Sequence, residues 1–130
     1  MQDVNFPMRF IDSSGNGTAL DSWNRRFITS GAALQKDFTM VEKYKELLKE
    51  LGFVDVVEIR ASMPVGTWAV GKKAKTLGSW MAQNVLGGLH AAGTAIMSRG
   101  LGMTAEEVEV DIANVRREIS SNRIHAYIRM

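Results

Sequence analysis

The alternation of apolar and polar residues within residues 52–68 predicts a strand that opens into a loop. Every second position is apolar, and a period of two indicates a strand with one buried face. The apolar positions are Val57, Ile59, Ala61 and Met63. Pro64 lacks the N–H that a ladder needs, so we expect the strand 53–63 to end there and a loop to carry Thr67 and Trp68. Open α/β sheets bind their ligands in loops at the carboxyl ends of strands.

Two helices are predicted before this strand. The first covers residues 21–34 and buries Trp23, Phe27 and Leu34. The second begins at a capping box formed by Thr39 and Glu42 and ends at Gly52, which supplies a left-handed stop. Its apolar stripe is Val41, Tyr44, Leu47, Leu48 and Leu51. A helix followed at once by a strand is typical of the α/β class.

The region before these helices is predicted to contain little regular secondary structure. Residues 1–4 could form the end of a strand, and we expect Pro7 to prevent a long continuation. Residues 12–18 have the composition of a loop. Its two glycines resemble a phosphate cradle only superficially, because no strong strand precedes them and no Gly-Lys-Ser/Thr follows. A plain turn is the prediction.

The second half of the chain is predicted to hold two helices and a last strand. The first helix covers about 73–99, and we expect either a break or a close backbone approach near Gly87 and Gly88. A second capping box at residues 104–107 begins the next helix. One face of that helix carries Val108, Ile112, Val115 and Ile119. Residues 124–130 alternate again and predict a buried strand.

Length and composition narrow the classes of function. A chain of 130 residues with 45% hydrophobic content predicts one domain, residues 1–130. It has no cysteine, so disulfides, thiolate metal sites and cysteine nucleophiles are excluded, and a cytoplasmic location is expected. We see no signal peptide and no membrane-spanning segment. The net charge is +2, and the basic cluster 72–75 lacks aromatic neighbours, so no nucleic-acid partner is predicted.

His90 and His125 are the candidates for acid–base chemistry, since either can titrate near neutral pH. A structural histidine is the alternative for each. The sequence has no His-Glu-x-x-His motif and no Gly-x-Ser-x-Gly elbow, so metal and serine-hydrolase sites are disfavoured.

The tryptophans and methionines suggest a small-molecule pocket. If Trp68 and Trp80 both face the loop after the strand, they could enclose a flat apolar molecule, with Met63 and Met81 completing the walls. Core packing explains each of these residues equally well.

Four blocks of the sequence resemble a known family. They are residues 45–58, 63–68, 99–109 and 124–127. In order and spacing they look like the carboxy-terminal part of the fungal class I S-adenosylmethionine-dependent methyltransferases of secondary metabolism, which include global regulators of that metabolism. The resemblance covers essentially the whole chain, and the first four residues look like the tail of the family's fifth strand.

The resemblance implies an α/β fold, the carboxy-terminal portion of a Rossmann-like methyltransferase. It implies a small sheet of two to three strands, with 53–63 as the sixth strand and 124–130 as the antiparallel seventh, and a helix-rich inserted lid over the substrate. The family binds its cofactor with a glycine-rich turn after the first strand and an acidic residue after the second, and this chain begins downstream of both. Gly100 and Gly102 lie between predicted helices and cannot replace that turn. No cofactor and no metal are therefore predicted for the chain alone.

A sheet that starts at the fifth strand would have an open edge at residues 1–5. We therefore expect a homo-oligomer, most simply a dimer, or a partner methyltransferase chain that covers this edge.

The functional hypothesis is a methyltransferase-like protein that acts on a fungal secondary metabolite without methyl transfer, as a cyclase or isomerase. His90, His125 and Asp3 are the catalytic candidates. The substrate-binding candidates are Gln2, Met63, Thr67, Trp68, Trp80 and Met81. Two alternatives stay open: a non-catalytic pseudo-methyltransferase that binds or regulates a partner, and one half of a split methyltransferase.

Overall fold

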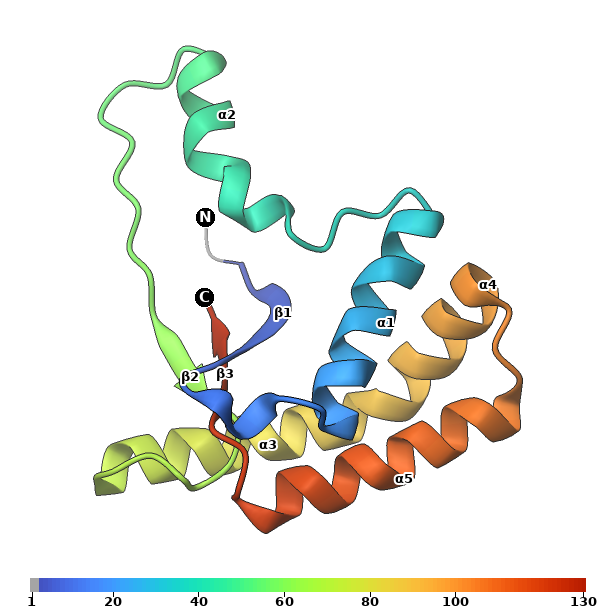
Figure 1. The fold of residues 1–130 in the computed structure, drawn as a ribbon. Helices are drawn as coiled ribbons and strands as arrows, with labels where there is room; N and C mark the ends of the chain where they lie inside the picture. Colours follow the sequence, from blue (N-terminus) through green and yellow to red (C-terminus); the bar gives the residue numbers. More distant parts are fainter. Residues whose placement is uncertain (1–2) are drawn as a thin grey trace.

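The sheet of the computed structural model, which describes residues 3–130, has three strands in the order β1-β3-β2 (Figure 1). The strands are β1 (Asn5–Phe10), β2 (Ser62–Pro64) and β3 (Ala126–Arg129). Both outer strands pair antiparallel with β3. An α/β fold with a small sheet and an antiparallel last strand is therefore confirmed.

Strand β1 continues through Pro7, contrary to the prediction. Asn5 pairs with Arg129 and Arg9 pairs with Tyr127, and the register shifts between these two pairs. Pro7 lies inside that irregularity on an edge strand, where a missing N–H removes no ladder hydrogen bond. Of the predicted strand 1–4, Asp3 and Val4 precede β1, and residues 1–2 lie outside the described residues.

Strand β2 is much shorter than the predicted strand 53–63. Only its last part pairs, with Ala61 and Met130 exchanging two backbone hydrogen bonds of 2.8 and 2.9 Å just before β2 begins. The preceding residues run outside the sheet and leave Val57 and Ile59 81% and 87% exposed. Because β3 has four residues, it offers no partner for a longer ladder. The predicted buried face is therefore wrong for Val57, Ile59 and Ala61, which are exposed, and only Met63 is half-buried.

Helix α1 (Ala19–Ala33) matches the first predicted helix to within two residues at each end. The Thr18 side chain caps it by accepting from the Asp21 N–H at 3.1 Å. Trp23 and Phe27 are buried and stack at 5.1 Å between ring centroids. These aromatic rings join α1 to the core.

Helix α5 (Ala105–Ser121) confirms the second capping box. The Glu107 N–H donates to the Thr104 hydroxyl at 3.2 Å, and the Thr104 N–H donates to the Glu107 carboxylate at 2.8 Å. The predicted apolar face is the buried one: Val108, Ile112, Val115 and Ile119. Together α1, α3 (Lys72–Ala92) and α5 surround the core of this chain.

The long helical region does not break at Gly87 and Gly88. Helix α3 passes through both, and a Cβ on either would meet nothing within 4 Å. The irregularity comes later, as a π-helical turn (Gly93–Met97) followed by α4 (Ser98–Leu101). The close backbone approach expected near the glycine pair is found instead at Gly78, against the Gly66 carbonyl.

Helix α2 (Tyr44–Glu50) differs most from the prediction. It follows a 3₁₀ turn (Met40–Lys43), and the Thr39 capping box does not form. The Thr39 hydroxyl donates to Asp37 at 2.6 Å, and the Glu42 carboxylate accepts from Asn5 and Arg9. These competing partners remove both halves of the box.

Residues 44–61, α2 and the segment leading to β2, form what we call the arm. Figure 1 shows α2 standing away from the three core helices, and no α2 residue is buried. Gly52 ends the helix with φ +90° as predicted, and the Gly52 and Phe53 N–H groups donate to the carbonyls of Lys49 and Leu48. Local signals thus shape the arm without burying it.

None of the helices in residues 3–130 combines the length and the apolar character that crossing a membrane requires. That the helices after β2 act as a substrate lid stays a prediction.

Candidate functional site

The carboxyl ends of β1 and β2 meet the start of β3 at one edge of the sheet. Both outer strands run antiparallel to β3, so they are parallel to each other and end on the same side. The Ile11 N–H donates to the His125 carbonyl at 3.1 Å, and the Trp68 indole N–H donates to the Ala126 carbonyl at 3.0 Å. We call the group Asp12, Ser14, Thr67, Trp68 and His125 the carboxyl-edge cluster.

An aspartate–histidine pair lies in this cluster. His125 Nδ1 is 2.5 Å from Asp12 Oδ2, and both side chains are partly exposed. Hydrogen bonds from the Ser14 side chain, from His125 and from the Ser14 N–H lower the pKa of Asp12 to about 2. Asp12 is therefore ionised at neutral pH. An Asp12-bound Nδ1–H leaves Nε2 of His125 as the basic nitrogen.

Trp68 forms a wall beside this pair. Its ring centroid is 5.1 Å from that of His125. The loop that carries it is held by the Gly66 N–H, which donates to Gly78 at 3.0 Å, and by the Thr67 N–H, which donates to the Asn122 side chain at 2.7 Å. Gly66 has φ +104°, a backbone conformation that favours glycine. The indole is thus fixed next to the imidazole.

Sequence reasoning missed Asp12 and Ser14. The segment 12–18 reads as a loop, and the structure confirms a turn there, with a 3₁₀ turn (Ser13–Gly15) capped by Asp12. The strand predicted at residues 1–4 ends well before Asp12, whereas β1 extends to Phe10, so no sequence signal placed Asp12 near a strand end.

The structure separates the other predicted site residues. His90 is exposed on α3 with Nδ1 2.5 Å from Glu109. Trp80 is 63% exposed, Met81 belongs to the core, and Met63 lies half-buried in β2. Of the predicted residues, only His125, Trp68 and Thr67 lie together in the carboxyl-edge cluster.

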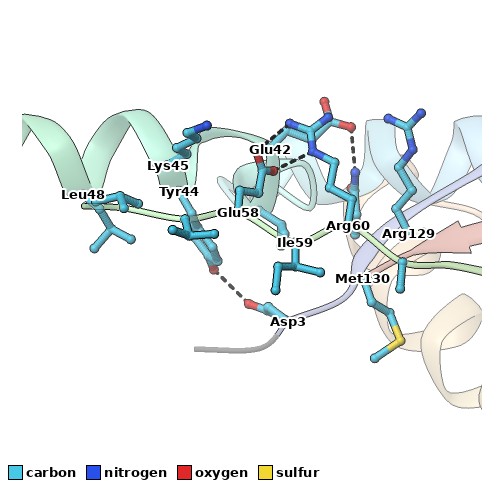
Figure 2. A pocket seen from close by; sticks show the side chains of 15 residues that line it. Asp3, Glu42, Tyr44, Lys45, Leu48, Glu58, Ile59, Arg60, Arg129 and Met130 are labelled. Carbon is cyan, nitrogen blue, oxygen red and sulfur yellow. Dashed lines mark hydrogen bonds and ion pairs between the residues drawn. The ribbon is translucent and has the colours of Figure 1, made fainter. Parts of the chain in front are cut away.

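Asp3 lies away from this cluster. Its carboxylate accepts from the Tyr44 hydroxyl at 2.9 Å, and it lines a cavity between the arm and the ends of β1 and β3 (Figure 2). Gln2 lies outside the described residues.

The glycine pairs of the chain do not fit the cofactor turn of a class I methyltransferase. Gly100 packs against α1, where a Cβ would lie 2.5 Å from the Ser30 carbonyl oxygen, and it lies inside α4 rather than in a turn after a strand. Gly15 lies between β1 and α1, but the first free N–H groups of α1, on Ala19 and Leu20, donate to the Glu118 carboxylate at 3.0 and 2.8 Å. A side chain thus fills the place that an anionic ligand would take. These glycines therefore do not supply a cofactor turn for S-adenosylmethionine.

No three His, Asp or Glu side chains within residues 3–130 are grouped as a metal site requires.

Comparison with known proteins identifies fungal relatives. The chain is 26% identical over 128 residues to the probable methyltransferase tdiE of Emericella nidulans, covering 98% of this chain and 40% of tdiE. It is 37% identical over 79 residues to methyltransferase pytC of Aspergillus terreus, covering 61% of this chain and 24% of pytC. It is 31% identical over 84 residues to the secondary metabolism regulator LAE1 of Cochliobolus heterostrophus, covering 64% of this chain and 27% of LAE1. No family model matches the chain, and no solved structure matches it.

The relatives are fungal methyltransferases and a regulator of secondary metabolism, so the predicted resemblance is confirmed. The chain spans less than half the length of each of them. The chain is thus an α/β chain that is similar to part of these fungal methyltransferases. Because the chain matches only part of each relative, the activity of the full-length relatives is not assigned to it.

Proposed function

We propose that this chain acts on a small-molecule intermediate of fungal secondary metabolism and rearranges it by proton transfer, as an isomerase or cyclase without methyl transfer. The observation that carries the proposal is the Asp12–His125 pair beside Trp68 at the carboxyl edge of the sheet. Ligand sites of α/β proteins lie at this edge.

The chemistry needs only groups that the cluster has. Nε2 of His125 takes a proton from an acidic C–H or O–H of the substrate, and Asp12 stabilises the imidazolium that forms. The same nitrogen returns the proton to another atom of the substrate, so no oxidant or co-reactant is consumed. Trp68 offers an apolar face that holds the substrate in a reactive conformation.

A gene-deletion experiment tests this function. The gene is deleted in the host fungus, and the strain is complemented with the wild type, His125→Gln or His90→Gln, each followed by metabolite profiling. His90 is the matched control because its Nδ1 also lies 2.5 Å from a carboxylate, but away from the cluster. We expect His90→Gln to restore the product and His125→Gln to leave the intermediate in place.

The masses of the metabolites decide between reactions. Rearrangement requires that the accumulating intermediate and the missing product have the same molecular mass. A difference of one methylene unit would favour methyl transfer, and full restoration by His125→Gln would refute the role of the pair.

We also propose that the chain forms a dimer through the outer edge of β1. Within residues 3–130, β1 pairs with β3 on one side only. The Asn24 side chain already bonds the N–H and C=O of Met8 on β1, at 2.9 and 3.0 Å, so a second chain can pair only with the other backbone groups of this edge. Phe6 adds an apolar side chain there that is 52% exposed. A partner methyltransferase chain is the alternative occupant, and in that case the isolated chain would be monomeric.

A further inference from the structure

The cavity that Asp3 lines is at the opposite ends of the strands from the carboxyl-edge cluster. It measures about 420 Å³ and is bounded by α2, by residues 56–61 of the arm, by the start of β1 and by the end of β3 (Figure 2). Cavities of a few hundred Å³ accommodate small organic molecules. None of the residues of the carboxyl-edge cluster lines it.

The arm contributes several aliphatic side chains to the wall of this cavity. Leu48 of α2 and Val57 and Ile59 of the arm line it, and the last two are 81% and 87% exposed. Exposed aliphatic side chains in a concave surface gain free energy when an apolar body covers them. The Tyr44 ring completes this side, fixed by its hydrogen bond to Asp3.

The charged side chains around the cavity leave one guanidinium without a carboxylate. Glu42 accepts from Asn5 at 2.6 Å and is ion-paired with Arg9. Glu58 holds Arg60 through two hydrogen bonds of 2.7 and 3.0 Å. Arg129 has no ion-pair partner among the described residues, although it lines the same cavity.

Arg129 is placed rigidly by the sheet. It is the last residue of β3, paired with Asn5 on one side and Ser62 on the other. A planar guanidinium on a fixed strand matches a carboxylate with two parallel hydrogen bonds. In Figure 2, the cationic ends of Arg129, Arg60 and Lys45 lie on one side of the cavity, and Tyr44, Ile59 and Met130 lie on the other.

We propose that this cavity binds a monocarboxylic acid with an apolar body, with Arg129 pairing with the carboxylate and Leu48, Val57 and Ile59 covering the body. A phosphate fits less well, because Asp3, Glu42 and Glu58 carry negative charge around the cavity and would repel a dianion. An amine fits less well because, among the lining residues without an ion pair within residues 3–130, the two cations Arg129 and Lys45 outnumber the one carboxylate, Asp3, which already accepts from the Tyr44 hydroxyl. This inference does not rest on the function proposed for the carboxyl edge.

Calorimetric titration of the full chain with octanoate tests the proposal, with 1-octanol as the uncharged probe of equal length. We expect one octanoate per chain and much weaker binding of octanol. Arg129→Gln should weaken octanoate by about tenfold or more, because a charge-assisted pair is lost. Arg116→Gln is the control, since Arg116 is exposed on α5 and outside the cavity.

A second pair of variants tests the apolar wall. Ile59→Ser should weaken octanoate, whereas Val70→Ser should not, because Val70 is 95% exposed but does not line the cavity. Neither side chain is part of the core, so both variants should fold. The proposal would be overturned by any of three results. These are no octanoate binding at millimolar concentration, octanol binding as tight as octanoate binding, or unchanged octanoate affinity in Arg129→Gln.

Discussion

Replacing Gly78 by alanine should destabilise the fold and move the Trp68 loop. Gly78 is buried in α3 and faces the loop after β2, where the Gly66 N–H donates to its carbonyl at 3.0 Å. A Cβ on Gly78 would lie 2.0 Å from the Gly66 oxygen and 3.0 Å from its carbonyl carbon. Both atoms are backbone, so no side-chain rotation relieves the overlap. The helix and the loop must therefore move apart.

The size of the effect follows from two opposing contributions. Alanine favours a helix interior over glycine by about 1 kcal/mol. Overpacking a tight contact costs about 1–3 kcal/mol, and an overlap with backbone belongs at the upper end. We therefore expect Gly78→Ala to lower the free energy of unfolding by about 2 kcal/mol. Gly87→Ala is the matched control in the same helix, because its Cβ would meet nothing within 4 Å. It should raise the free energy of unfolding by about 1 kcal/mol.

Urea unfolding followed by circular dichroism measures both variants, and tryptophan fluorescence reports on the Trp68 loop. The two variants should shift the midpoint in opposite directions, and only Gly78→Ala should change the native fluorescence. If Gly78→Ala is as stable as Gly87→Ala, the close approach of α3 to the loop is refuted.

Four further outcomes are expected. Thr104→Ala should cost about 1 kcal/mol of stability in urea unfolding, whereas Thr39→Ala should cost clearly less, because the Thr104 side chain caps a helix and the Thr39 side chain does not. Glu118→Ala should cost about 2 kcal/mol in the same assay, since it leaves two N–H groups of α1 without their acceptor, and an unchanged midpoint would contradict that role. The pKa of Asp12 is lowered to about 2 in the folded state, so its stabilisation is present above pH 4 and is lost as the pH falls toward 2; Asp12→Asn should lack this part of the acid dependence of unfolding. Light scattering at micromolar concentration should give the mass of a dimer, and a monomer would refute pairing through β1.

The helices could be predicted because their signals are local. A capping residue, an apolar stripe and a glycine stop all act within one segment, and for α5 the sequence indicated the start, the box and the buried face correctly. The Thr39 box failed because Asn5 and Arg9, far away in sequence, engage Glu42. A local pattern cannot reveal such a distant competitor.

For a similar reason, only part of the carboxyl-edge cluster could be predicted from the sequence. Trp68 and His125 follow from the strand pattern, because Trp68 lies in the loop after β2 and His125 directly precedes β3. Asp12 required knowledge that β1 continues through Pro7 and ends beside β3, which depends on the register with β3. Sheet neighbours, unlike helix faces, are set by pairing between segments.

The arm has the alternating sequence pattern of a strand, but before Ala61 it has no neighbouring strand among the described residues with which to form hydrogen bonds. Val57 and Ile59 keep the alternation that predicted a strand, but β3 is too short to pair with them, so their side chains line an open cavity instead of a sheet face. Exposed apolar groups at this spacing cost free energy unless something covers them. The guanidinium of Arg129 at the same cavity restricts what can do so to a molecule that is apolar along most of its length and anionic at one end. Val57 and Ile59, the residues at which the strand prediction fails, are therefore the ones that indicate the class of ligand.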